Sequence, residues 1–152
     1  MEKLMKAWFI VALITFILFK LGEVMTTTYD GTASEGNLYW VVLILGWPFI
    51  LLFIWITIRL TRTVVASVHP LGKIGLLLGL ILMAMISWTT NLTQAESLRA
   101  AIRSSEHARF SEGWNQFTNI IYMNQLTFFL LTVSCMVIGV MWSYLPKKER
   151  TE

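Results

Sequence analysis

The sequence predicts an all-α membrane protein with four transmembrane helices, and three observations support this prediction. Of the 152 residues, 56% are hydrophobic and only 14% are charged, whereas soluble domains average about 25% charged residues. The apolar residues form four long blocks, each close to the roughly 20 residues that a helix needs to cross a bilayer. Most of the basic residues lie at the two termini and in the loop between the second and third blocks, which are on the same side of the predicted membrane. The composition excludes a soluble enzyme, a nucleic-acid-binding module and a disulfide scaffold, and it leaves residues 1–152 as a single membrane domain.

The first predicted span covers residues 4–21 and follows a basic start. A secretory signal peptide shares this charge pattern, but the block is bulky and no small-x-small cleavage site follows it. The second span, residues 38–60, contains Gly46 and Pro48 near its centre. Because proline removes a backbone hydrogen bond, we expect a kink there, which neighbouring helices or water can tolerate. We interpret Trp47, beside this proline, as a helix-packing residue, with a ligand-facing role as the alternative.

The third span covers residues 71–90, and Pro70 stands at its boundary, where the first helical turn tolerates proline. The fourth span covers residues 122–145 and ends at Pro146. Together with the first two blocks, these spans predict a four-helix membrane bundle whose connecting loops are short, apart from the one that precedes the fourth span.

The distribution of charge predicts that both termini face the cytoplasm. Eight of the twelve basic residues lie on the side of the termini and of the loop between the second and third spans. That side has a formal charge of +5 and the opposite side −2, and the positive-inside rule places the basic side in the cytoplasm. The short loops and the absence of an organelle presequence favour the plasma membrane, specifically a bacterial inner membrane.

The second outer loop is predicted to contain an amphipathic helix at about residues 93–112. Thr93 and Glu96 have the spacing of a capping box, and apolar residues recur after them at helical spacing. The sequence leaves several interpretations of this segment open. It is a plain connector, a docking surface for a partner protein or a lid over a cavity, or it extends the third or fourth span as a helix. The candidate docking residues are Leu98, Ile102 and Arg103.

Small residues on the third span predict a close helix–helix contact. Gly75 and Gly79 form a small-xxx-small element, which Gly72 precedes, and such a stripe lets another helix approach closely within lipid. The partner is either another helix of this chain, with Gly139 of the fourth span as the matching surface, or a different subunit.

Amide side chains gather at the outer mouth of the fourth span. The residues of this polar cluster are Asn115, Asn119 and Asn124. Amides at such a position can coordinate a polar ligand, bond to a partner helix or lie in interfacial water, and the sequence leaves these alternatives open.

The sequence contains no motif for a metal, haem, nucleotide or thiol-redox centre, and no cofactor is expected. Its single cysteine, Cys135, lies inside the fourth span, and His69 and His107 fall on opposite sides of the membrane. The deep parts of the spans contain no ionisable residue, although buried ionisable groups are typical of proton and ion transport. A proton-coupled carrier is therefore not expected.

These observations predict a non-enzymatic membrane protein that acts through protein–protein contacts, as an accessory or assembly subunit or as an immunity or exclusion factor. The alternative is a small channel or permease subunit that forms a homo-oligomer around the kinked second span. A third hypothesis is an enzyme that acts on a lipid or quinone, with Glu96, Arg103, His107 and Glu112 as its residues. The expected partners are the lipid bilayer and another membrane protein or a second copy, and no nucleic acid.

Overall fold

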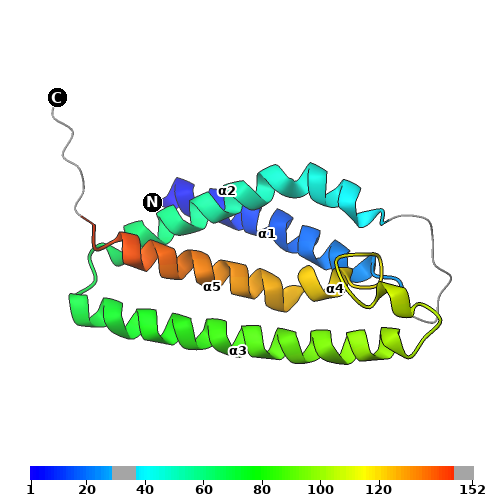
Figure 1. Cartoon of the computed structure of the whole chain (residues 1–152). Helices are drawn as coiled ribbons and strands as arrows, with labels where there is room; N and C mark the ends of the chain where they lie inside the picture. The colour runs from blue at the N-terminus through cyan, green and yellow to red at the C-terminus, as the bar shows by residue number, and fades with distance from the viewer. Residues whose placement is uncertain (29–36, 146–152) are drawn as a thin grey trace.

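The computed structural model describes residues 1–28 and 37–145, and this part of the chain folds into helices (Figure 1). Four helical segments of the described chain are long and apolar enough to cross a membrane, with α4 and α5 counted as one segment. The all-α fold class is confirmed, and the chain is a multi-pass membrane protein. The elements in chain order are α1 (Glu2–Val24), α2 (Tyr39–Val65), α3 (Pro70–Arg103), the 3-10 turn η1 (Ala108–Phe110), α4 (Asn119–Tyr122) and α5 (Gln125–Trp142).

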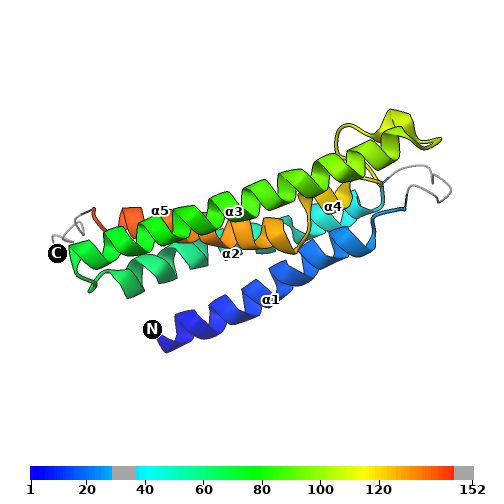
Figure 2. The same ribbon diagram turned by 90° about the horizontal axis from the view of Figure 1, so that it is seen from below.

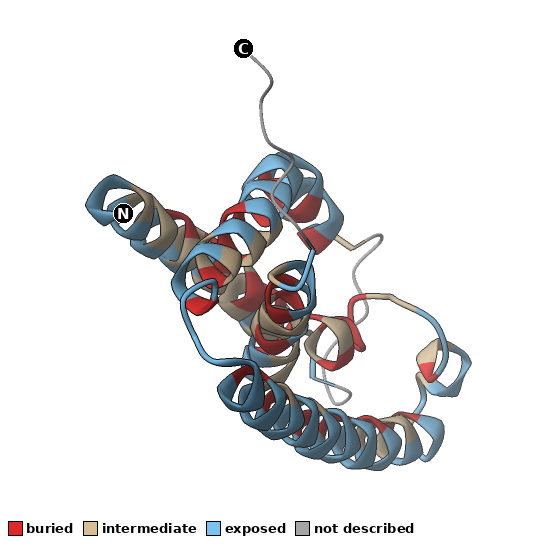
Figure 3. Ribbon diagram, turned by 90° about the vertical axis from the view of Figure 1, so that its left-hand side faces the viewer, coloured by how far each residue is buried: buried red, intermediate tan, exposed pale blue. Residues whose placement is uncertain are grey.

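The helices form a four-helix bundle that is open between α1 and α3. α2 and α5 pack against each other, α1 packs mainly on α2, and α3 packs on α5. α1 and α3 make no extensive contact, and they diverge towards the N-terminus of α1 (Figure 2). Viewed end-on in Figure 3, α3 is the long helix at the bottom, and most of its outward side is exposed. We call the end that holds residues 104–118 the loop end, and the end that holds residues 66–69 the terminal end.

α3 begins as the sequence predicts and ends later. Pro70 occupies its first position, and the Nδ1 atom of His69 accepts a hydrogen bond from the Leu71 amide at 3.3 Å. The helix has 34 residues, and at a rise of about 1.5 Å per residue it spans about 51 Å, against about 30 Å for a hydrocarbon core. Its last turns therefore extend beyond the hydrocarbon core at the loop end.

The separate amphipathic helix expected at residues 93–112 does not form. Residues up to Arg103 continue α3, and turns with the short η1 follow, so the alternative that this segment extends the third span is the correct one. Thr93 is not a helix cap, because its hydroxyl donates to the Thr89 carbonyl at 3.1 Å within α3. The backbone hydrogen bonds of a continuous helix replace those of the predicted capping box.

The fourth span, expected as one helix over residues 122–145, is broken near its start. Met123 and Asn124 adopt extended backbone conformations between α4 and α5. Asn124 caps α5 with a reciprocal pair of bonds: its side chain accepts from the Thr127 amide at 2.9 Å, and its own amide donates to the Thr127 hydroxyl at 2.9 Å. This capping box ends one helix and begins the next. Pro146, the predicted end of the span, lies outside the described residues.

The glycines of the spans differ in what surrounds them. A Cβ atom on Gly139 would lie 2.7 Å from the Thr61 Cβ and 2.9 Å from the Ile58 carbonyl oxygen, so Gly139 permits close approach of α5 to α2. Around Gly75 and Gly79 of α3, a Cβ would meet nothing within 4 Å. The expectation that Gly139 receives these two glycines is therefore wrong, because its partner is α2.

Replacing Gly139 with alanine should destabilise the fold, whereas Gly79→Ala should not. The new methyl group at position 139 would press on backbone of α2, and such overpacking costs about 1–3 kcal/mol. Position 79 has open space around it, and alanine favours helix over glycine by about 1 kcal/mol. Thermal unfolding of both purified variants in one detergent provides the comparison. Equal losses of stability would contradict the α2–α5 packing.

Candidate functional site

The outward side of α3 is the candidate interaction site. α3 buries one stripe of residues against the rest of the chain, and Gly75 and Gly79 lie away from this stripe. We call Gly75, Gly79, Leu82 and Ile86 the glycine face, because steps of three and four residues place them on one side of the helix. The buried stripe of α3 consists of Lys73, Leu80, Ser87, Asn91, Ala95 and Ile102.

The glycine face combines exposed apolar side chains with a depression in the helix surface. Leu82 and Ile86 are 58% and 57% exposed, and the two glycines leave the backbone uncovered one and two turns before them. The third glycine, Gly72, differs, because a Cβ there would lie 2.9 Å from Cγ1 of Val68 in the preceding turn. Gly72 therefore packs near its own chain, and only Gly75 and Gly79 offer an open surface.

The polar cluster predicted at the mouth of the fourth span is used within the chain. Asn119 is fully buried. Its Oδ1 atom accepts from the Trp114 indole at 3.0 Å and from the Asn37 amide at 2.7 Å. Its Nδ2 atom donates to Asn37 at 3.0 Å and to the Met25 carbonyl at 3.5 Å. Asn119 thus joins the loop end of α1, the start of α2 and the long loop.

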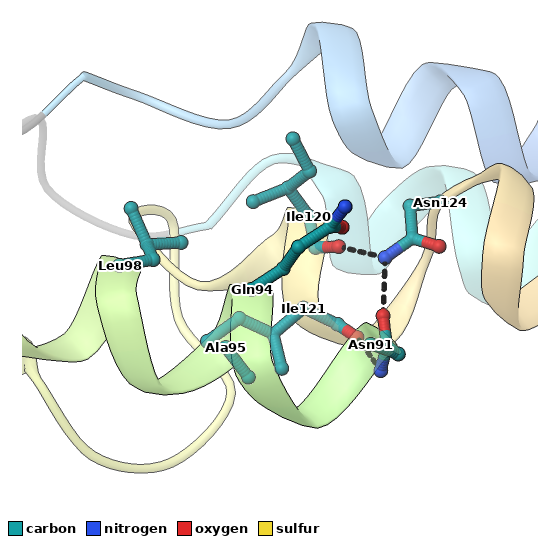
Figure 4. A pocket seen from close by; sticks show the side chains of 7 residues that line it. All are labelled: Asn91, Gln94, Ala95, Leu98, Ile120, Ile121 and Asn124. Carbon is teal, nitrogen blue, oxygen red and sulfur yellow. Dashed lines mark hydrogen bonds between the residues drawn. The ribbon is translucent and has the colours of Figure 1, made fainter. Parts of the chain in front are cut away.

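Asn124 forms a second link at the loop end, between the helix break and α3 (Figure 4). Its Nδ2 atom donates to Asn91 Oδ1 at 2.8 Å and to the Ile120 carbonyl at 2.5 Å, and Asn91 in turn donates to the Ile121 carbonyl at 3.2 Å. These bonds satisfy carbonyls that the break between α4 and α5 leaves without helical partners.

Asn115, the third member of the cluster, holds the loop itself. Its Nδ2 atom donates to the carbonyls of Phe110 and Glu112 at 2.9 and 3.1 Å, and its Oδ1 accepts from the Phe117 amide at 2.9 Å. All three asparagines of the predicted cluster therefore bond within the chain and organise its loop end.

The three candidate docking residues do not form one surface. Ile102 is completely buried, so it is not available to a partner, and this part of the sequence prediction is wrong. Arg103 forms an exposed ion pair with Glu112 across the loop. Leu98 is half-buried and lines a small cavity with Gln94 and other residues of Figure 4.

Two recesses at the loop end have walls that are mainly apolar and include a few amide side chains. The one in Figure 4 has a volume of about 150 Å³, and a neighbouring one of about 280 Å³ is lined by Glu23, Gln94 and Gln125 among others. Lys20 pairs with Glu23 at 2.7 Å, the i,i+3 contact that their spacing allows. Both recesses have room for ordered water, which in proteins bonds to polar groups such as these amides.

The residues named for an enzymatic hypothesis are only partly brought together. Arg103 and Glu112 pair, whereas the His107 ring stacks on Phe117 with centroids 4.8 Å apart, and Glu96 lies on the last part of α3. In the described ranges, no group of three or more histidine, cysteine or acidic side chains could hold a metal ion.

Sequence reasoning missed the polar bonds between the spans. The Trp8 indole donates to the Thr57 hydroxyl at 2.9 Å, and the Ser87 hydroxyl donates to the Leu126 carbonyl at 3.1 Å. Hydroxyl groups in spans often bond to their own helix, as Thr132 does with the Phe128 carbonyl at 2.9 Å. Residue type alone does not distinguish the two behaviours, because the difference depends on which helix lies opposite.

Comparison of the chain with protein-family models, with curated proteins and with solved structures finds no match.

Replacing Asn119 with alanine should destabilise the loop end, whereas Gln94→Ala should change stability little. The Asn119 variant leaves the Trp114 indole and the Asn37 amide without their partner, and an unsatisfied buried polar group costs about 1–3 kcal/mol. Gln94 is exposed and its side chain has no hydrogen bond to the described residues, so it is a matched amide control. Unfolding in detergent measures both effects, and a stable Asn119 variant would refute the structural role of this residue.

Proposed function

We propose that this chain is a non-enzymatic membrane subunit that associates with another membrane protein through the glycine face of α3. The observation that supports the proposal is the open space around Gly75 and Gly79. Transmembrane helices associate through close packing at small residues, since lipid provides no hydrophobic driving force between them. A face with two glycines one turn apart suits this kind of contact.

The free-energy cost of placing glycine inside a helix supports the same proposal. Glycine inside a helix costs about 1 kcal/mol relative to alanine. At Gly139, close packing on α2 offsets this cost within the chain, whereas at Gly75 and Gly79 no described residue packs against the position. A partner helix would supply the missing contacts.

The position of α3 in the fold also suits a partner. α3 lies at the edge of the arrangement, packs on α5 along one stripe and makes no extensive contact with α1. Its outward side is therefore accessible over several turns (Figure 3). The role that follows is that of an accessory or assembly subunit of a larger complex, or of an immunity or exclusion factor.

The double variant Gly75→Leu with Gly79→Leu should abolish this association and leave the fold intact. Leucine side chains fill the depression that the partner helix would enter, while the isolated chain has space for them. The measurement is the mass of the intact particle extracted from the native membrane into nanodiscs. We expect the wild-type particle to contain a second polypeptide in fixed stoichiometry and the variant particle to lack it.

A matched control places extra bulk elsewhere on the same helix. Ile74→Phe and Ile81→Phe change exposed positions of α3 that are not three or four residues from any member of the glycine face, and they should keep the partner. Recovery of the same complex from wild type and the double leucine variant would refute the proposal. A wild-type homo-oligomer without another polypeptide would instead favour the small channel or permease subunit.

We further propose that the protein lies in a bacterial inner membrane with the terminal end in the cytoplasm, as the charge distribution indicates. Ser67→Cys and Ser104→Cys place single thiols at the terminal end and the loop end. The native Cys135 is 3% exposed and should react little. A membrane-impermeant maleimide added to intact cells should label position 104 and should label position 67 only after lysis. The reverse pattern would overturn this orientation.

A further inference from the structure

An apolar groove lies between α2 and α5 at the loop end, on a different side of the fold from the glycine face. Its volume is about 670 Å³. Its α2 wall runs from Trp40 through Ile44 and Trp47 to Ile54, and its α5 wall includes Leu131. No residue that lines it is ionisable apart from the hydroxyl of Tyr122 at its end. We call this space the aromatic groove.

The groove exists because α2 and α5 separate along their length. They meet closely where Gly139 faces Thr61 and stand apart at the loop end (Figure 1). Pro48 lies inside α2, and it lacks the N–H that would bond to the Ile44 carbonyl. The bent first half of α2 therefore leaves a space beside α5 that no side chain of the described residues fills.

Three aromatic rings in contact, with Trp114 tilted against Trp40 and stacked on Tyr122, close the groove at the loop end. The Trp40 and Trp114 ring centroids are 4.7 Å apart, and those of Trp114 and Tyr122 are 4.9 Å apart. Asn119 holds the Trp114 indole by the hydrogen bond described above. The Tyr122 hydroxyl accepts from Arg99 at 3.4 Å, and Arg99 Nε is buried without a hydrogen-bond partner. This end of the groove thus has an aromatic wall, and the positively charged Arg99 guanidinium lies next to the Tyr122 hydroxyl of that wall.

Two hydrogen-bond donors in the walls have no partner among the residues that the structure describes. The indole N–H groups of Trp40 and Trp47 form no hydrogen bond with any described residue, although those of Trp8 and Trp114 do. An unpaired N–H is costly within hydrocarbon, and near the headgroups, where α2 begins, lipid carbonyls are available acceptors. A ligand that lies in the groove and presents a carbonyl oxygen would satisfy such a donor.

We propose that the aromatic groove binds one acyl chain of a bilayer phospholipid, with an ester carbonyl accepting a hydrogen bond from Trp40. The groove lies between membrane spans, so its occupant enters from the bilayer. From Trp40 to Ile54 it extends for about 21 Å at the rise of a helix, which matches an extended fatty acyl chain. A helix of about 10 Å diameter would occupy roughly 1,600 Å³ over that length, so a whole helix cannot lie within the groove, whereas an acyl chain is thin enough.

Charge distinguishes a phospholipid from a neutral isoprenoid quinone. The uncharged walls suit the hydrocarbon chain, while Trp40, in the first turn of α2, lies at the depth where tryptophan meets lipid headgroups. Arg99 places a positive charge at this same end, complementary to a phosphate. The glycine face contributes nothing to the groove, so this inference stands apart from the proposed partner contact.

The test compares two neighbouring substitutions on α2. Ile44 and Leu45 are 70% and 72% exposed, but only Ile44 lines the groove. Native mass spectrometry after delipidating purification should find one retained phospholipid per chain in wild type and in Leu45→Trp. Ile44→Trp fills the groove and should lose this lipid. Thermal unfolding of both variants verifies that they remain folded.

A second pair of variants tests the Trp40 donor while an aromatic ring stays at the position. Trp40→Phe keeps an aromatic ring and removes the N–H, and it should weaken lipid retention about five-fold, the equivalent of one hydrogen bond of about 1 kcal/mol. Trp88→Phe, on exposed α3 away from the groove, is the control. Retention of a quinone in place of a phospholipid, no retained lipid, or equal loss in Ile44→Trp and Leu45→Trp would each overturn the inference.

Discussion

The constraint on which this structure depends is that polar groups within hydrocarbon need partners inside the protein. The chain meets it with a few bonds between helices. The Tyr39 hydroxyl donates to the Leu18 carbonyl at 3.0 Å, and the Trp8–Thr57 bond joins the same two helices near the terminal end. Ser87 performs the same task between α3 and α5. These bonds define which helices are neighbours, whereas dispersion contacts alone would permit several arrangements.

α2 and α5 are in close contact at one end and separate at the other, where the aromatic groove lies. Gly139 lets the two backbones approach closely at Thr61. The bent α2 then moves away from α5 towards the loop end, where the aromatic groove lies. The glycines of α3 differ, because Gly75 and Gly79 face open space instead of a neighbouring helix. A glycine in a span thus indicates a close contact, and only its surroundings show whether that contact lies within the chain.

The loop end connects the polar network with the groove. Asn119 is bonded to two other segments, at Met25 and Asn37, and also holds Trp114, whose ring contacts those of Trp40 and Tyr122. Asn124 and Asn91 secure the break between α4 and α5, and Met123 at that break lies on the groove wall. The broken fourth span is therefore not a local irregularity, because the wall of the groove and the support of the long loop both depend on it.

The sequence by itself determined the class of the protein, the four spans and the start of α3 at Pro70, because block length and helix-start chemistry are local properties. Only the tertiary structure decided the length of α3, the faces of its glycines and the break after Tyr122. The Asn124–Thr127 cap was present in the sequence, but an uninterrupted apolar run masked it. Asn119 was recognised as polar, yet its partner Asn37 lies 82 residues away. Such contacts arise from the pairing of helices, which hydropathy does not specify.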